Sequence, residues 1–195
     1  MKRTISYLLP VLFLLGACGQ DPIIETPVLE GDQFFINYDG ENEAAPQLPA
    51  GGFFEAATQL TPDTWETSDS ASLVSVYFYL DALPEESSLL IYRGGANDRP
   101  DTLLLSQSLS RRQLTAGSWN KIDLDRAILL EDQDIWISYR FTNAVDQRTL
   151  GCDPGPANPL GNWLYDSFDE QWISLETRTQ GGIDINWNLR GVVNP

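Results

Sequence analysis

Hydrophobic and polar residues alternate along several short stretches of this chain, most clearly at 74–80, 103–109, 135–141 and 183–190. Successive side chains of a β-strand point to opposite faces of its sheet, so each stretch predicts a strand with one buried face. Glycine, proline and asparagine cluster between the stretches, as at 94–98, and no stretch has the longer period of an amphipathic helix. The pattern therefore predicts an all-β fold, an antiparallel two-sheet β-sandwich.

The parity of each alternation predicts which side chains face the core. Val74 is expected to point inward with Val76, and Leu103 with Leu105. The alternation is most regular at 183–190, where the apolar set is Ile183, Ile185, Trp187 and Leu189 and the polar set is Asp184, Asn186, Asn188 and Arg190. A slip of one residue would bury four polar groups, so we expect a firmly fixed register. The polar row is either a binding face or the solvated side of a sheet.

A different pattern occupies the N-terminus. Lys2 and Arg3 precede an apolar run that ends at Ala17, which is shorter than the roughly 20 residues that a membrane span needs. The last residues of the run, Leu-Gly-Ala followed by Cys18, resemble the lipobox of bacterial lipoproteins. In that family the chain is cut before the cysteine, which becomes acylated. We expect a lipoprotein signal peptide at 1–17 and lipidation of Cys18; an ordinary secretory signal is the alternative.

The residues after Cys18 bear on location. Residues 18–32 contain two prolines and several acids without periodicity, which predicts an extended linker before a sandwich domain at 33–194. Gly19 stands where inner-membrane lipoproteins of enteric bacteria carry aspartate, and Gln20-Asp21 resembles the export signals of surface lipoproteins in Bacteroidetes. We therefore expect an outer-membrane lipoprotein, exposed on the cell surface and held in the membrane by Cys18.

Composition narrows the chemistry. The chain has 12 basic and 28 acidic residues, a formal net charge of −16, which argues against nucleic acid as a partner. It contains no histidine, which excludes Ser-His-Asp and Cys-His arrangements and the usual zinc sites. We expect that the chain is not an enzyme, although a carboxylate-based glycoside hydrolase remains an alternative. Once Cys18 is lipidated, Cys152 has no disulfide partner and is expected to be a small buried residue.

Three groups of segments carry a more specific likeness. They are Tyr38-Asp39-Gly40-Glu41-Asn42 with residues 51–57, then residues 114–120 with 135–139, and finally Gly151-Cys152-Asp153-Pro154-Gly155-Pro156-Ala157 with 161–163 and 186–190. They resemble the jelly-roll β-sandwich modules of secreted and surface proteins of Bacteroidetes, related to the cleaved adhesin domains of gingipain-type proteases. The resemblance implies a jelly-roll-like module for adhesion or recognition. Those modules accompany a protease, whereas here a lipid tether is expected in its place.

Structural calcium is the cofactor that the resemblance suggests. Residues 39–43 place oxygen-bearing side chains around a glycine, and a hard cation needs several oxygens at close range. By analogy with the family we predict calcium at Asp39, with Asn42 and Glu43; a solvated acidic turn is the alternative. Asp153 is a second candidate, although an aspartate in such a turn commonly bonds its own backbone.

Aromatic residues supply the candidate binding site. Trp163, Tyr165 and Trp172 fall near turns, and Trp136 has the opposite parity to its inward-facing neighbours. Aromatic rings at a rim can stack on sugars or anchor a protein. We therefore predict adhesion or recognition of a glycan or an extracellular protein through these four residues. Two alternatives stay open: the rings close the end of the core, or the chain is a structural lipoprotein that faces the periplasm.

Overall fold

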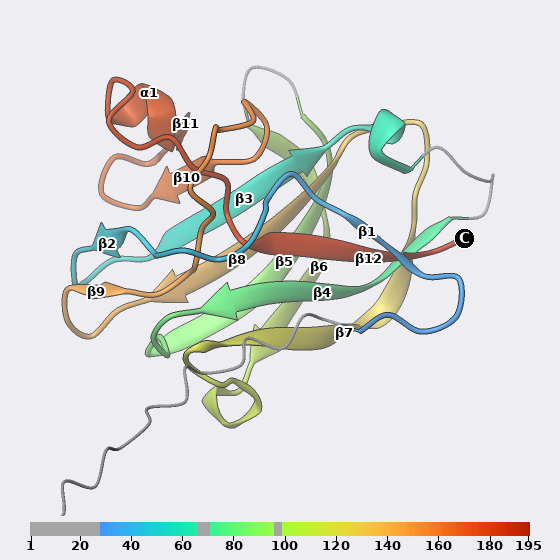
Figure 1. Cartoon of the computed structure of the whole chain (residues 1–195), viewed down its shortest axis with the longest axis horizontal. Coiled ribbons are helices and arrows are strands. Elements are labelled where there is room, and N and C mark those ends of the chain that lie inside the picture. Colours follow the sequence, from blue (N-terminus) through green and yellow to red (C-terminus); the bar gives the residue numbers. More distant parts are fainter. Residues whose placement is uncertain (1–27, 66–70, 96–98) are drawn as a thin grey trace, which may run out of the picture.

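The computed structural model describes residues 28–65, 71–95 and 99–195, and in it two antiparallel sheets lie face to face (Figure 1). One sheet has the strand order β1 (Phe34–Ile36), β12 (Leu189–Asn194), β4 (Ser72–Leu80) and β7 (Ser118–Leu129). The other has the order β11 (Gln171–Ser174), β10 (Trp163–Asp166), β3 (Phe54–Leu60), β8 (Ile135–Thr142), β5 (Glu86–Gly95) and β6 (Pro100–Leu109). A short pair, β2 (Gln47–Leu48) and β9 (Gln147–Arg148), lies at one end.

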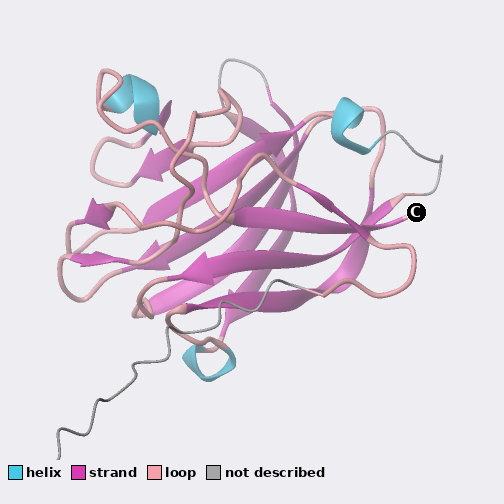
Figure 2. Cartoon of the chain, in the orientation of Figure 1, coloured by secondary structure: helices cyan, strands magenta, loops and turns pink. Residues whose placement is uncertain are grey.

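The described helical segments are single turns between strands (Figure 2): α1 (Leu175–Arg178) and two 3-10 turns, Pro62–Trp65 and Arg111–Gln113. No helix in the described ranges is long and apolar enough to cross a membrane. The architecture confirms the predicted all-β sandwich. The predicted signal peptide (1–17) and Cys18 lie outside the described residues, as does most of the predicted linker.

The strand pairs are nested around the β5–β6 hairpin. Moving outward from that hairpin, β4 pairs with β7, β3 with β8, and β2 with β9, so most of the chain is one long hairpin rolled over itself. Nested pairs that alternate between two sheets are the topology of a jelly roll. The core between the sheets includes Phe54, Leu73, Phe78, Ile137, Tyr139 and Trp187. Each such buried side chain contributes about 1.5–3 kcal/mol to stability.

Two irregularities in the ladders correct the predicted inward faces. Ile91 pairs with Leu105 but Tyr92 pairs with Leu103, so Leu104 is the extra residue of a β-bulge. The parity of β6 changes there, and Leu103 is half exposed while Leu104 packs against the core. A similar break beside Val74 in β4 places Leu73 in the core instead. The inward positions predicted for Leu103 and Val74 are therefore wrong.

The polar row at 184–190 is not the solvated face of a strand, because only Asp184 is exposed. The ladder of β12 begins only at Leu189, and the preceding Asn186 and Asn188 are buried. Asp153 accepts hydrogen bonds from the backbone N of Asn186 at 2.7 Å and from its Nδ2 at 3.0 Å. The same carboxylate accepts from the backbone N of Gly40 at 2.9 Å and from that of Gly155 at 3.0 Å. Asp153 thus bonds its own turn, as its alternative interpretation held, and also ties three distant segments together.

Asp39 holds the other half of this network. Its fully buried carboxylate accepts hydrogen bonds from Asn188 Nδ2, from Arg190 Nε, both at 2.8 Å, and from Asn37 Nδ2 at 2.9 Å. The guanidinium of Arg190 also lies over the Trp119 ring, 4.2 Å from its centroid. A buried charge is tolerated only when it is paired and hydrogen-bonded. Arg190 is therefore the group that permits Asp39 to be buried.

Cys152, which precedes Asp153, is buried. Burial, with a smaller contribution from the nearby Asp153, raises the pKa of its thiol to about 12. The thiol is protonated and unreactive at neutral pH. The prediction of a small buried residue at this position is confirmed.

We predict that Arg190→Met lowers the free energy of unfolding by about 3–5 kcal/mol, because the substitution leaves the Asp39 carboxylate buried without a cation. Equilibrium urea denaturation measures the loss. The matched control is Lys121→Met, which removes the partner of the exposed Asp123, 3.3 Å away. That change should cost less than about 1 kcal/mol. Equal losses in the two variants would contradict the role assigned to Arg190.

Candidate functional site

The outer face of the six-stranded sheet carries a second apolar cluster, separate from the core. It consists of Ala57, Trp136 and Trp163, with Tyr92 and Trp172 packed against it. The Trp136 ring centroid lies 5.4 Å from that of Trp163 and 5.8 Å from that of Trp172. Large aromatic rings fit here because the neighbouring strand β3 presents the small Ala57 on the same face. The cluster forms an aromatic floor on the outside of the sheet.

Two of the four residues predicted to bind a ligand, Trp136 and Trp163, are buried in this floor. Trp136 does lie opposite the inward-facing Ile135 and Ile137, but only 1% of it is exposed, and Trp163 is 8% exposed. Neighbouring strands and rings cover both indoles, so neither presents a face to a ligand. They do not close the end of the core either, because their cluster on the outer face is separate from the core. Trp136 and Trp163 support the site from below.

Tyr165 and Trp172, in contrast, are partly exposed and lie directly opposite each other on β10 and β11, with ring centroids 5.7 Å apart. Phe53, at the entrance to β3, stacks on Tyr165 at 5.7 Å with an interplanar angle of 18°. The three rings form a half-buried aromatic edge above the floor. Phe53 is a site residue that the sequence prediction missed. It shares parity with Glu55 and Ala57, so the alternation in β3 could have placed it on this face.

A buried carboxylate stands beside the aromatic edge. Glu55 is 2% exposed, and its Oε2 accepts a hydrogen bond from Arg140 Nε at 2.9 Å and forms an ion pair with Arg140 Nη2 at 2.8 Å. The hydroxyl of Tyr92 donates to Glu55 Oε1 at 2.7 Å. Burial and the charge of Glu55 raise the pKa of Tyr92. Burial, the largest single effect, lowers the pKa of Arg140, but the charges and hydrogen bonds of Glu55 and Tyr92 together outweigh it and the pKa is raised. At neutral pH Tyr92 is therefore a hydrogen-bond donor and Arg140 is charged.

The contact with Glu55 fixes Arg140 but leaves part of its guanidinium exposed. Its side chain is 40% exposed, and its guanidinium lies over the Phe53 ring, 4.9 Å from the centroid. A guanidinium has five N–H donors in a fixed fork, and the bonds to Glu55 occupy two of them. Donors therefore remain that can bond the oxygens of a ligand. Sequence reasoning missed both Glu55 and Arg140, because charged residues on a strand suggest an ordinary solvated face.

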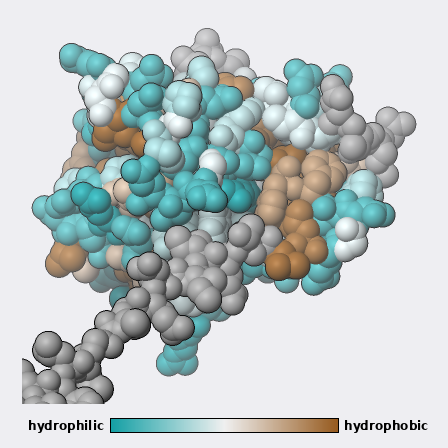
Figure 3. Space-filling view, viewed as in Figure 1, coloured by the Kyte–Doolittle hydropathy of each residue, from teal (hydrophilic) through white to brown (hydrophobic). Residues whose placement is uncertain are grey.

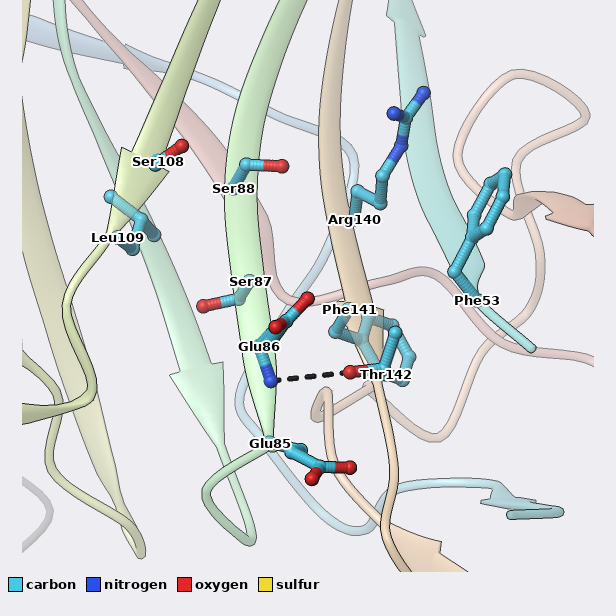
Figure 4. A pocket seen from close by; sticks show the side chains of 10 residues that line it. All are labelled: Phe53, Glu85, Glu86, Ser87, Ser88, Ser108, Leu109, Arg140, Phe141 and Thr142. Carbon is cyan, nitrogen blue, oxygen red and sulfur yellow. Dashed lines mark hydrogen bonds between the residues drawn. The ribbon is translucent and has the colours of Figure 1, made fainter. Parts of the chain in front are cut away.

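Two hollows adjoin at Arg140 and Phe53, which line both. The smaller, of about 210 Å³, is lined further by Glu55, Tyr92, Pro100, Tyr165 and Trp172. The larger, of about 500 Å³, extends over β8, β5 and β6, where Ser88, Ser108 and Thr142 supply hydroxyls (Figure 4). At its far end the backbone N of Glu86 donates to Thr142 Oγ1 at 3.2 Å. The combined hollow has the size of ligand sites in proteins, which span about 300–1,000 Å³.

The strand registers align six of these side chains in one line across the sheet. In each adjacent pair the residues are direct partners: Trp172 with Tyr165, Tyr165 with Glu55, Glu55 with Arg140, Arg140 with Ser88, and Ser88 with Ser108. Direct partners share a face of the sheet. We call these six residues the crosswise row: Trp172, Tyr165, Glu55, Arg140, Ser88 and Ser108. The row crosses all strands of the sheet and lies in both hollows.

The residues predicted to bind calcium lie elsewhere, near β12. Asp39 is already paired with Arg190 and two asparagines, and Glu43 is exposed. Asn42 Oδ1 is buried without a hydrogen-bond partner, against Gly151, where any side chain would overlap it. Within the described ranges, no group of three or more His, Cys, Asp or Glu residues could hold a metal ion. The buried oxygens Asn42 Oδ1 and Asn188 Oδ1, which both lie beside Gly151 without a hydrogen-bond partner, favour a cation here, and calcium stays a prediction.

If calcium binds this turn, a chelator lowers the melting temperature, because a ligand that binds only the native state stabilises it. The expected result is a lower melting temperature in EDTA that added calcium restores. Glu43→Gln should weaken the response, whereas Glu41→Gln, in the same turn but outside the predicted set, should keep it. Thermal unfolding with and without EDTA measures both. An unchanged wild-type melting temperature would remove the site.

No protein-family model and no curated protein matches the chain. Among solved structures, the clostridial cysteine protease Cwp84 after propeptide cleavage matches with a TM-score of 0.56 and 16% identity, over 84% of this chain and 40% of that one. A structure of the cysteine protease and lectin-like domains of Cwp84, a surface layer associated protein of Clostridium difficile, matches with a TM-score of 0.50 and 16% identity, over 73% and 32%. The chain therefore spans less than half of either protein. Likeness at this identity shows the fold, an all-β sandwich.

These structures also correct one expectation. The prediction that the chain is not an enzyme is wrong as it stands, since two solved chains that share its fold belong to a cysteine protease. The missing histidine excludes particular catalytic arrangements and no more than those.

Proposed function

We propose that this protein recognises a carbohydrate on the outer face of its six-stranded sheet. The observation that carries the proposal is the aromatic edge of Phe53, Tyr165 and Trp172 beside the exposed donors of Arg140. Sugar rings have apolar faces that stack on aromatic rings and hydroxyls that accept hydrogen bonds from a guanidinium. Both kinds of contact are available within one hollow.

The shape of the site favours a carbohydrate over a folded protein partner. Protein interfaces are broad patches with a well-packed apolar centre, whereas here the exposed aromatics line one side of a hollow and the other side is polar. The hydroxyls of Ser88, Ser108 and Thr142 extend the polar part. One of the similar structures is described as containing lectin-like domains, in keeping with this proposal.

The proposal includes a lipid anchor at Cys18, an outer-membrane location exposed at the cell surface, and kinship with the adhesion modules of Bacteroidetes. The position of Val28 supports this arrangement: its carbonyl accepts a hydrogen bond from the Tyr77 hydroxyl at 3.4 Å. Tyr77 lies on the outer side of the four-stranded sheet, since its neighbours Val76 and Phe78 face the core. Figure 3 shows this side, where most of the visible described surface is hydrophilic. The chain thus enters the domain on the side opposite the hollows, which leaves them free to face away from a membrane.

We predict that Trp172→Ala and Phe53→Ala each weaken carbohydrate binding at least about tenfold, equivalent to about 1.4 kcal/mol. Each removes one ring of the aromatic edge and leaves the core intact. The measurement is a glycan array followed by titration calorimetry on the best ligand. The matched control is Leu129→Ala, which truncates an exposed apolar side chain on the four-stranded sheet and should bind as wild type.

Melting curves of the variants separate loss of the site from loss of the fold. Variants that melt like wild type but bind glycan unchanged would overturn the site. Binding of a protein but no glycan in pull-downs would replace carbohydrate with the protein alternative.

The location is tested on whole cells of the native host. We predict that a protease added outside intact cells degrades this protein while a periplasmic marker survives, because a surface lipoprotein is accessible from the medium. Mass spectrometry of the protein from the same cells should find Cys18 acylated. A protein that survives intact until the outer membrane is opened would instead support the periplasmic alternative.

A further inference from the structure

The crosswise row restricts what kind of carbohydrate fits. Neighbouring strands of a sheet lie about 4.7–4.9 Å apart, so the five steps from Trp172 to Ser108 cover about 24 Å. A ligand that contacts both ends is much longer than one sugar ring. The two hollows share Phe53 and Arg140, so an extended chain can pass from one hollow to the other.

The two ends of the row offer different contacts. At one end the rings of Trp172 and Tyr165 provide stacking surfaces. Beyond Arg140 the contacts are the hydroxyls of Ser88 and Ser108, on β5 and β6. A chain lying across the strands would therefore stack one unit on the aromatic end and hydrogen-bond further units along the rest. Arg140 lies between the two ends, fixed by the buried Glu55.

The charges along the row disfavour an anionic ligand. Glu55 neutralises Arg140, at 2.8 Å, and the larger hollow is lined further by Glu85 and Glu86. The whole chain carries a formal charge of −16, which repels anions at a distance. We infer that the site takes an uncharged, extended oligosaccharide chain, laid across the strands along the crosswise row. This inference rests on the proposed carbohydrate function and specifies its ligand class.

The test is a length series of uncharged oligosaccharides, with cello-, xylo-, manno- and malto-oligosaccharides of increasing length as probes and oligogalacturonate as the acidic counterpart. Titration calorimetry with the full chain should show affinity rising at least about tenfold from the disaccharide to the longest member of the preferred series. Oligogalacturonate of equal length should bind more weakly. Equal affinity at every length, or tighter binding of the acidic chain, would overturn the inference.

Two matched variants locate the second half of the ligand. Ser88→Ile fills the larger hollow at a strand position where a β-branched side chain is favoured. It should reduce the affinity of the long chain to that of the short one and leave the short one unchanged. The control is Ser106→Ile. Ser106 lies on the same face of β6 as Ser108, opposite Leu90, but lines neither hollow, so this variant should bind as wild type.

The outcomes distinguish a failure of the extended-chain inference from a failure of the proposed carbohydrate recognition. If Ser88→Ile leaves long-chain binding unchanged while Trp172→Ala abolishes it, the ligand ends before Ser88 and the extended-chain inference falls, but carbohydrate recognition stands. If no saccharide of any length binds the folded wild-type protein, both fall together.

Discussion

Two buried carboxylates, Asp39 and Asp153, hold the C-terminal segment of the chain against the turn that follows β1. Asn186, Asn188 and Arg190 reach them from one side, and the backbone of Gly40 from another. The nested strands need such a closure, because the rolled hairpin brings its first and last strands together only at the end of the roll. Side-chain amides, backbone N–H groups and one guanidinium supply the hydrogen-bond donors to these two carboxylates. The buried Asp39 carboxylate is therefore strongly destabilising if its partner Arg190 is removed.

The candidate site lies on the other, six-stranded sheet, so the Asp39 and Asp153 network affects it only by stabilising the fold. It repeats the same device, however: Glu55 is buried beside Arg140 as Asp39 is beside Arg190. The difference lies in what remains exposed. Arg190 is mostly covered and serves the fold, whereas Arg140 is open to both hollows and keeps unused donors. The same pairing that neutralises a buried acid therefore also orients a guanidinium whose remaining donors are accessible.

The sequence predicted the layers of the fold better than the details of either face. Alternation located β4, β6 and β8 because period-two patterning reflects one buried face directly. It misplaced Val74 and Leu103, because a bulge shifts parity without leaving a mark in the pattern of hydrophobic residues. It took residues 184–190 for the polar face of a strand, either solvated or binding, because buried asparagines and exposed ones look alike in sequence. Trp172 and Tyr165 were predicted as binding residues from their place near turns, and the structure places them, partly exposed, opposite each other. Glu55 and Arg140 were missed because they form their ion pair as cross-strand partners, and the sequence does not show which strands pair.

The crosswise row is a consequence of register, which no local pattern in the chain contains. Its members come from six strands spread between Glu55 and Trp172, and they align only because every antiparallel ladder has the observed pairing. Such a row on strands is stiffer than a site on loops, since each backbone position is held by ladders on one or both sides. The floor of Trp136 and Trp163 adds to this stiffness by fixing Trp172 from below. A preorganised row of this kind reduces the cost of ordering protein side chains when a ligand binds.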